Sequence, residues 1–147
     1  MINLTGEEIE LGAKNISVVS GYENLIALTE EGLIEKRKDP GGGEPYFYVE
    51  AVADNMKFGV TISLREKKIE WLLLRWLDGP CTNKGWDGVS EEVLKDEYHT
   101  LSKFVEQRAG SPPNDKRNRR RMWCFQWGKL EVSYEPRSFN VAIFMEP

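Results

Sequence analysis

Three segments with β-type patterning follow one another between residues 46 and 76, with short polar turns between them. In the second segment, apolar side chains alternate with small or polar ones, as expected for a strand with one buried face. Consecutive strands joined by short turns form an antiparallel meander. The predicted strands and turns, in order, are 46–53, the turn 54–55, 57–65, the turn 66–68, and 69–76.

The third of these segments, residues 69–76, is apolar on both faces except for Glu70 and Arg75. A strand with two apolar faces is typically buried on both sides. We therefore expect this strand to lie near the middle of the sheet, with other elements covering each of its faces.

A helical pattern follows the loop-forming segment 78–88. Ser90, Glu91 and Glu92 are typical of a helix start, because a serine can cap the first turn and acids are stabilised there. Apolar side chains then recur at helical spacing, at Leu94, Tyr98, Leu101, Phe104 and Val105. The stripe predicts a helix over about residues 90–108 that packs on the sheet.

The last part of the chain has three more segments of strand character, separated by turn signals at Gly128 and at residues 135–138. In residues 129–135 the side chains alternate between apolar and polar, which indicates one wet face. The predicted closing strands are 122–127, 129–135 and 139–145.

Residues 1–40 are open to two interpretations. Residues 20–23 match a capping box, and the apolar spacing that follows predicts a helix over about residues 21–31. Alternatively, residues 16–19 and 25–28 form the two strands of a hairpin around a Ser-Gly turn. The segment 39–45 contains three glycines and two prolines, which favours a loop.

These elements predict an α+β fold: a single domain over residues 1–147, with an antiparallel sheet and a long helix packed on it. A chain of 147 residues is long enough to bury a core without a disulfide or a metal. Its 40% hydrophobic and 30% charged content argues against disorder, and no apolar run approaches the length of a membrane span.

The start of the sequence has neither a basic region nor a long apolar run, so we expect no secretory signal and a cytoplasmic location. Cys81 and Cys124 are the only cysteines, and we expect both to be reduced, packed thiols.

The sequence lacks the linear motifs of the common enzyme classes. It contains no nucleophile elbow, no phosphate loop and no dinucleotide fingerprint. His99, the only histidine, falls near the border of the helix's solvent face, and no nucleophile motif accompanies it. Cys81, His99 and Cys124 do not have a zinc-ligand spacing. We therefore expect no enzyme activity, no cofactor and no metal.

The net charge of −4 is unevenly distributed. Residues 1–110 carry 20 acids and 13 bases, whereas residues 111–121 carry one acid and five bases. The basic run 116–121 could contact nucleic acid phosphates, but an acidic body repels nucleic acid. We interpret the run as a solvated loop before an edge strand, where basic residues oppose aggregation.

Acids gather at the start of the long helix, with Lys95 as the only base among them. They suit the helix dipole, and they would also suit a docking face for a basic protein partner, with tryptophans as anchors. We expect Trp71 and Trp127 to be interior, whereas Trp76 and Trp86 lie in or beside the loop that adjoins the acids. The candidate partner-binding residues are Trp76, Trp86, Asp87, Glu91, Glu92, Asp96 and Glu97.

Three features together resemble small bacterial α+β proteins of the immunity type. They are the strand 58–64, the Gly-Trp-Asp loop 85–87 with its following helix, and Trp127-Gly128 leading through residues 134–138 to a last apolar strand. Such proteins include immunity proteins of polymorphic toxin and type VI secretion systems. The resemblance covers about residues 46–145 and carries over no binding residue, because each family member's face suits its own toxin.

The resemblance and the absent catalytic motifs together predict a non-catalytic protein-binding domain that neutralises a cognate toxin. A secretion-effector chaperone is the first alternative, and it would expose large apolar patches. An acid/base enzyme is the second, because such catalysis needs no linear motif. We expect a protein partner, a basic toxin or effector, and no nucleic acid or membrane.

Overall fold

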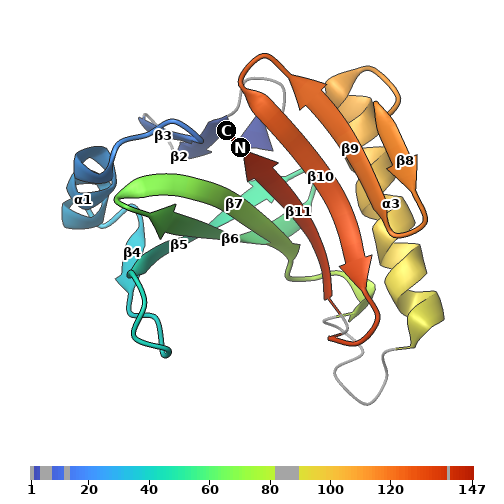
Figure 1. Ribbon diagram of the computed structural model, residues 1–147, viewed down its shortest axis with the longest axis horizontal. Helices are drawn as coiled ribbons and strands as arrows, with labels where there is room; N and C mark the ends of the chain where they lie inside the picture. Colours follow the sequence, from blue (N-terminus) through green and yellow to red (C-terminus); the bar gives the residue numbers. More distant parts are fainter. Residues whose placement is uncertain (1, 4–7, 12–13, 82–89, 139) are drawn as a thin grey trace.

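The computed structural model describes residues 2–3, 8–11, 14–81, 90–138 and 140–147 (Figure 1). Within them, eight strands form one antiparallel sheet in the order β4-β5-β6-β7-β11-β10-β9-β8. The strands are β4 (Glu35–Arg37), β5 (Tyr46–Ala53), β6 (Met56–Arg65), β7 (Lys68–Trp76), β8 (Asp115–Arg117), β9 (Arg120–Phe125), β10 (Gly128–Glu135) and β11 (Asn140–Glu146).

The predicted meander of residues 46–76 is confirmed as β5, β6 and β7. Both connecting turns have positive φ at their two central residues, Asp54 and Asn55 in one and Glu66 and Lys67 in the other. Tight hairpin turns with this twist usually contain asparagine or glycine. A residue outside the hairpin stabilises the second turn: the backbone N–H of Glu66 donates to the Glu44 carboxylate at 2.7 Å.

The central position predicted for β7 is confirmed, because it pairs with β6 on one side and with β11 on the other. The expected cover on both of its faces is wrong. Leu72 and Leu74 are fully buried, but Trp71 and Leu73 on the opposite face are half-buried and Arg75 is exposed. The core therefore lies against one face of the sheet.

The helix predicted for residues 21–31 is confirmed as α1 (Tyr22–Glu30), so the hairpin interpretation is wrong. The residues before it pair instead within a second, three-stranded sheet that the sequence did not reveal. Ile9 and Ile16 of that sheet are fully buried in the same cluster as Leu25 and Leu28 of α1. Its strands are β1 (Ile2–Asn3), β2 (Glu8–Leu11) and β3 (Lys14–Ser17).

The long helix is confirmed as α3 (Glu91–Ala109). The Ser90 hydroxyl accepts from the Val93 N–H at 3.3 Å, which caps the first turn. Gly110 ends the helix with φ 71°, a conformation that residues with a Cβ rarely adopt. All five apolar residues of the predicted stripe are buried.

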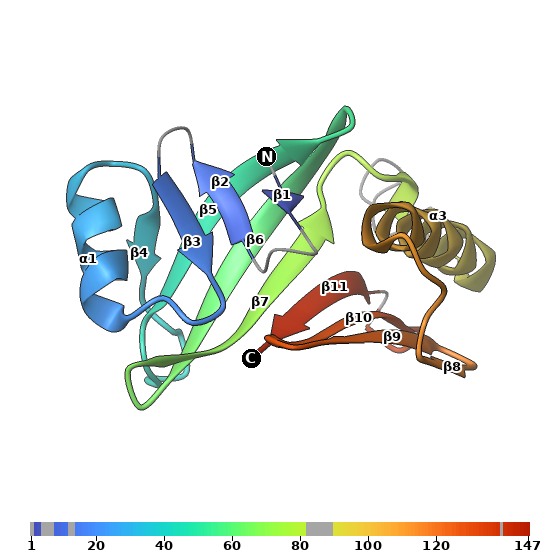
Figure 2. The same cartoon turned by 90° about the horizontal axis from the view of Figure 1, so that it is seen from above.

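Two layers cover the core face of the large sheet (Figure 2). The N-terminal sheet with α1 lies beside the β4–β7 half, and α3 lies beside the β8–β11 half. Ring contacts connect α3 to both halves: Phe104 lies 5.6 Å from Phe58 of β6, and Tyr98 lies 5.0 Å from Tyr134 of β10. The α+β class and the antiparallel sheet with a helix on it are thus confirmed, although the sheet is larger than expected.

The basic segment 116–121 is not the solvated loop that we expected. Residues 115–125 form a tight hairpin, β8–β9, with Lys116 opposite Arg121 and Arg117 opposite Arg120. The carboxylate of Asp115 relieves the charge repulsion, because it contacts Arg117 at 3.1 Å and Arg120 at 3.8 Å. The basic residues therefore form the edge of the sheet itself.

The expected interior tryptophans are also corrected. Trp71 and Trp127 are only half-buried, whereas Trp123 of β9 is 1% exposed. The indole N–H of Trp123 donates to the Ser111 carbonyl at 3.0 Å, which ties β9 to the chain that leaves α3. This bond satisfies the one polar atom of an otherwise apolar core residue.

Two alanine substitutions, one on the buried side and one on the exposed side of α3, test how the helix packs. Leu101→Ala should lower the free energy of unfolding by about 2–5 kcal/mol, because it leaves a cavity under the helix. Lys103→Ala, at an exposed position of the same helix, is the matched control and should change it by less than about 0.5 kcal/mol. Equal small losses in denaturant unfolding would contradict the packing described.

Candidate functional site

Three of the seven predicted partner-binding residues lie together on the exposed surface of α3. Glu91, Glu92 and Asp96 are all solvent-exposed near the helix start. Lys95 lies 3.9 Å from the Glu91 carboxylate, a distance at which an exposed ion pair contributes little. Glu92 and Asp96 face solvent one helical turn apart. Trp86 and Asp87 lie outside the described residues.

Glu97 does not belong to this exposed group, contrary to the prediction. Its side chain is 2% exposed and packs against the segment that follows β7, where its Oε1 accepts from the Cys81 N–H at 3.2 Å. Gly79 lies so close to it that an added Cβ would come within 2.6 Å of the same oxygen. Burial raises the pKa of the Glu97 carboxyl, although the hydrogen bond from Cys81 and the charge of Arg75 oppose the rise.

Trp76, a predicted aromatic anchor, is the last residue of β7. Its indole is half-buried, packs against the core cluster and leaves no room for a side chain at position 79. A hydrogen bond from Trp76 helps to keep the pKa of Asp78 below its usual value, after the larger effect of the Lys57 backbone N–H. Trp76 thus helps to hold the turn after β7.

The thiol of Cys81 is poorly suited to react as a nucleophile. Burial and the nearby Glu97 carboxylate raise the pKa of its thiol to about 12, so the reactive thiolate is scarce at neutral pH. The thiol also points to the Val93 carbonyl at 3.9 Å. Cys81 and Glu97 are therefore a structural pair that joins the segment after β7 to α3, rather than a nucleophile and its base.

Cys124 is exposed on β9, so the prediction of two packed thiols is wrong for this one. Both cysteines are free thiols. In the part of the chain that the structure describes, no three histidine, cysteine or acidic side chains gather in a way that could hold a metal ion.

A cationic pocket separates α3 from the β8–β9 hairpin, which lies alongside the helix in Figure 1. Lys95 and His99 line it from the helix, and Lys116, Arg117 and Arg121 line it from the hairpin. Its apolar wall contains the rings of Tyr98 and Tyr134. Sequence reasoning assigned Tyr98 to the core and residues 116–121 to a loop, and so missed that the two come together.

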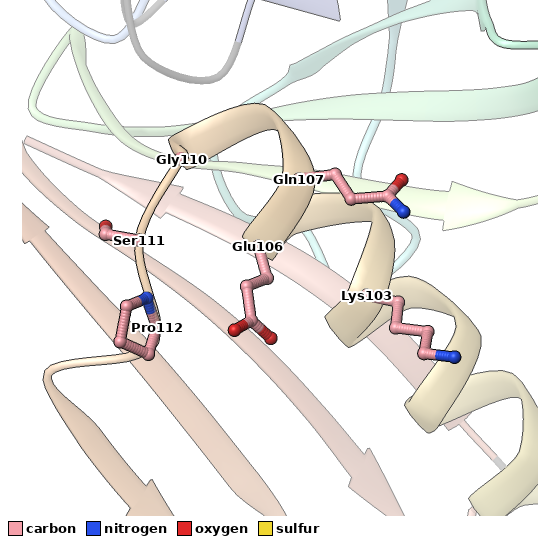
Figure 3. Close-up of a pocket in the computed structure, with 6 residues that line it drawn as sticks. All are labelled: Lys103, Glu106, Gln107, Gly110, Ser111 and Pro112. Atoms are coloured by element: carbon pink, nitrogen blue, oxygen red, sulfur yellow. The ribbon is translucent and has the colours of Figure 1, made fainter.

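A second hollow lies at the end of α3, where Gly110 turns the chain toward Pro112 (Figure 3). The side chains of Lys103, Glu106 and Gln107 extend from the helix in different directions in this view. Side chains that recognise a ligand converge on one point, so this hollow has no arrangement suited to binding.

Comparisons with protein-family models, with curated proteins and with solved structures found no match for this chain. Among the described residues, no helix is both long enough and apolar enough to cross a membrane. The fold and the geometry of these surfaces are therefore the observations that bear on function.

The buried carboxyl group of Glu97 makes stability depend on pH. Because its pKa in the folded chain lies above the ordinary value of 4.5, the folded state binds more protons than the unfolded state just above pH 4.5. The free energy of unfolding contributed by this group therefore falls as pH rises through that window. Glu97→Gln should remove this dependence and gain stability relative to wild type between pH 4.5 and 7, measured by denaturant unfolding.

Two further variants serve as controls for Glu97→Gln. Glu97→Ala leaves the Cys81 N–H without its acceptor and should cost about 1–3 kcal/mol. Glu92→Gln makes the same substitution at an exposed position of the same helix and is the matched control. An unchanged profile in Glu97→Gln would contradict a raised pKa.

The two thiols should differ in reactivity. Cys124 should be alkylated by iodoacetamide in the folded protein at pH 8, whereas Cys81 should react only on unfolding, because so little of it is thiolate. Mass spectrometry of wild type and Cys124→Ser follows each site. Rapid alkylation of Cys124→Ser under native conditions would contradict the assignment.

Proposed function

We propose that this protein is a non-catalytic protein-binding domain of the immunity type, which neutralises a basic toxin by occupying its active site. The exposed acids Glu91, Glu92 and Asp96 carry the proposal, because they stand on a long, capped helix that is fixed to the sheet by its buried stripe. A rigid element presents charges without a large cost in ordering them on binding.

The charge of the whole chain supports a basic partner. The net charge is −4, and residues 1–110 contain seven more acids than bases. An acidic protein with an acidic docking face accelerates the encounter with a basic protein, and this effect weakens as salt is added. Occupation of an active site by an acidic helix would mimic the anionic substrate of a nuclease or a similar enzyme.

The alternatives draw less support from the described residues. A secretion chaperone needs a contiguous apolar surface, but the exposed large apolar residues are single ones in separate segments: Val19 before α1, Leu33 after it, and Val52 in β5. An acid/base enzyme needs an accessible carboxyl group whose pKa is raised toward neutral pH. The Glu97 carboxyl has a raised pKa but is covered by the segment at Gly79 and Cys81, and the exposed Asp78 has a lowered pKa.

Charge reversal on α3 tests the docking face. Glu92→Lys with Asp96→Lys should lower the association rate constant for the cognate toxin by about tenfold or more at low salt, because the steering charge is inverted. Salt should slow association less in this variant than in wild type. The measurement is stopped-flow or surface plasmon resonance with a catalytically dead toxin taken from the neighbouring reading frame.

Glu23→Lys with Glu30→Lys on α1 is the matched control. It makes the same change in net charge and likewise reverses one acid in the first turn of a helix. If the two double variants slow association equally, only net charge matters and α3 is not the docking face. If the toxin does not bind the wild-type chain at all, the immunity function is wrong.

A further inference from the structure

The cationic pocket between α3 and the β8–β9 hairpin contains two buried polar groups that no described residue satisfies. Tyr98 is 2% exposed, and its hydroxyl group has no hydrogen-bond partner. The Nε of Arg121 is likewise buried and without a partner. An unpartnered polar group in such a place costs about 1–3 kcal/mol, and a water molecule or a bound ligand would remove this cost.

These two groups lie together at the wall of the pocket. The Arg121 guanidinium carbon lies 5.2 Å from the centre of the Tyr98 ring, within the range of a cation–π contact. The ring of His99 lies edge-on to Tyr98 at 5.5 Å. Tyr98 also packs edge-on against Tyr134. The Tyr98 hydroxyl and the Arg121 Nε each expose less than 1 Å² to solvent, so a ligand reaches them only when the partly buried Arg121 side chain shifts.

The charged residues that line the pocket are all basic, and none of its lining residues is acidic. Two of these cations are paired with acids beside the pocket: Arg117 with Asp115 at 3.1 Å and Lys95 with Glu91 at 3.9 Å. Among the described residues, Lys116 and Arg121 form no ion pair. A pocket that gathers cations in an acidic protein has a field suited to an anion.

The hydroxyl of Tyr98 adds a neutral donor to these cations. Burial raises the pKa of Tyr98 above its ordinary value of 10.0, although the charge of Arg121 opposes the rise, so the phenol stays protonated at neutral pH. A protonated phenol donates one hydrogen bond, and a guanidinium donates several in a planar fork that matches an oxyanion.

We propose that this pocket binds phosphate, either free or as a phosphomonoester, with Tyr98 and Arg121 as donors to its oxygens and with Lys116 as a counter-charge. Two cations without an acidic partner favour a doubly charged oxyanion over a singly charged one. The site lies on the hairpin side of α3 and does not depend on the toxin-binding function, so each proposal stands or fails separately.

Isothermal titration with inorganic phosphate tests the site in the purified full chain, with sodium chloride matched for ionic strength. Saturable binding with one site is expected, together with a melting temperature that rises with phosphate concentration. Phenyl phosphate, in a parallel titration, distinguishes the sources: tighter binding than inorganic phosphate assigns the ligand as a phosphomonoester, and equal binding assigns free phosphate. No saturable binding of either, or equal stabilisation by chloride, would overturn the proposal.

Two substitutions locate the site. Tyr98→Phe removes only the hydroxyl and should weaken phosphate binding by about tenfold, with no loss of stability, because the missing group had no partner in the protein. Arg121→Gln should weaken binding by about tenfold or more. Arg119→Gln, in the turn of the same hairpin, removes the same charge outside the pocket and should change the dissociation constant less than about twofold.

The stability of each variant is read from denaturant unfolding. If Arg121→Gln does not fold, the phosphate affinity of Tyr98→Phe alone tests the site, because phenylalanine preserves the ring contacts of Tyr98. Wild-type affinity in Tyr98→Phe and Arg121→Gln, or an equal loss in Arg119→Gln, would mean diffuse charge attraction and would overturn the assigned site.

Discussion

The pairing of β7 with β11 is the contact on which the rest of the fold depends. Leu72, Leu73 and Leu74 lie opposite Met145, Phe144 and Ile143, so two meanders that are remote in sequence become one sheet. Without this pairing each half would have an open edge and an apolar face too small to bury. The long helix α3 contacts residues on both sides of that seam, at Phe58 and at Tyr134, and so it can take its position only when the halves are joined.

Local features of the fold were readable in the sequence because local chemistry determines them. The alternation in residues 57–65 and the polar pairs at 54–55 and 66–67 define β5–β7, and Ser90 and Gly110 define the ends of α3. The three-stranded N-terminal sheet was missed because its strands are four residues or fewer and carry no clear alternation. Its stability depends on burial against α1 and β5, which no local pattern expresses.

The exposure of the acids on α3 was predicted only in part, for reasons that particular residues show. Glu97 was grouped with the exposed acids by its charge, yet it lies three residues after Leu94 and four before Leu101, so helical spacing already placed it on the buried face. Periodicity was the stronger signal there, and composition was misleading. The Lys116–Arg121 run gave no such signal, because a hairpin of basic residues is stabilised by Asp115 and by its place at the sheet edge rather than by apolar alternation.

The buried polar groups on the two sides of α3 differ in whether they have a hydrogen-bond partner. On the flank toward β7, the Glu97 carboxylate receives the Cys81 N–H, and Gly79 makes room for it. On the side toward β9, the Tyr98 hydroxyl and the Arg121 Nε have no hydrogen-bond partner among the described residues. The chain contains 24 acids, yet no described acid forms an ion pair with Arg121 or Lys116. A structural role for Tyr98 would be served equally by phenylalanine, which has the same ring and no polar atom to satisfy. The proposed phosphate site would give this hydroxyl the partner that no described residue supplies.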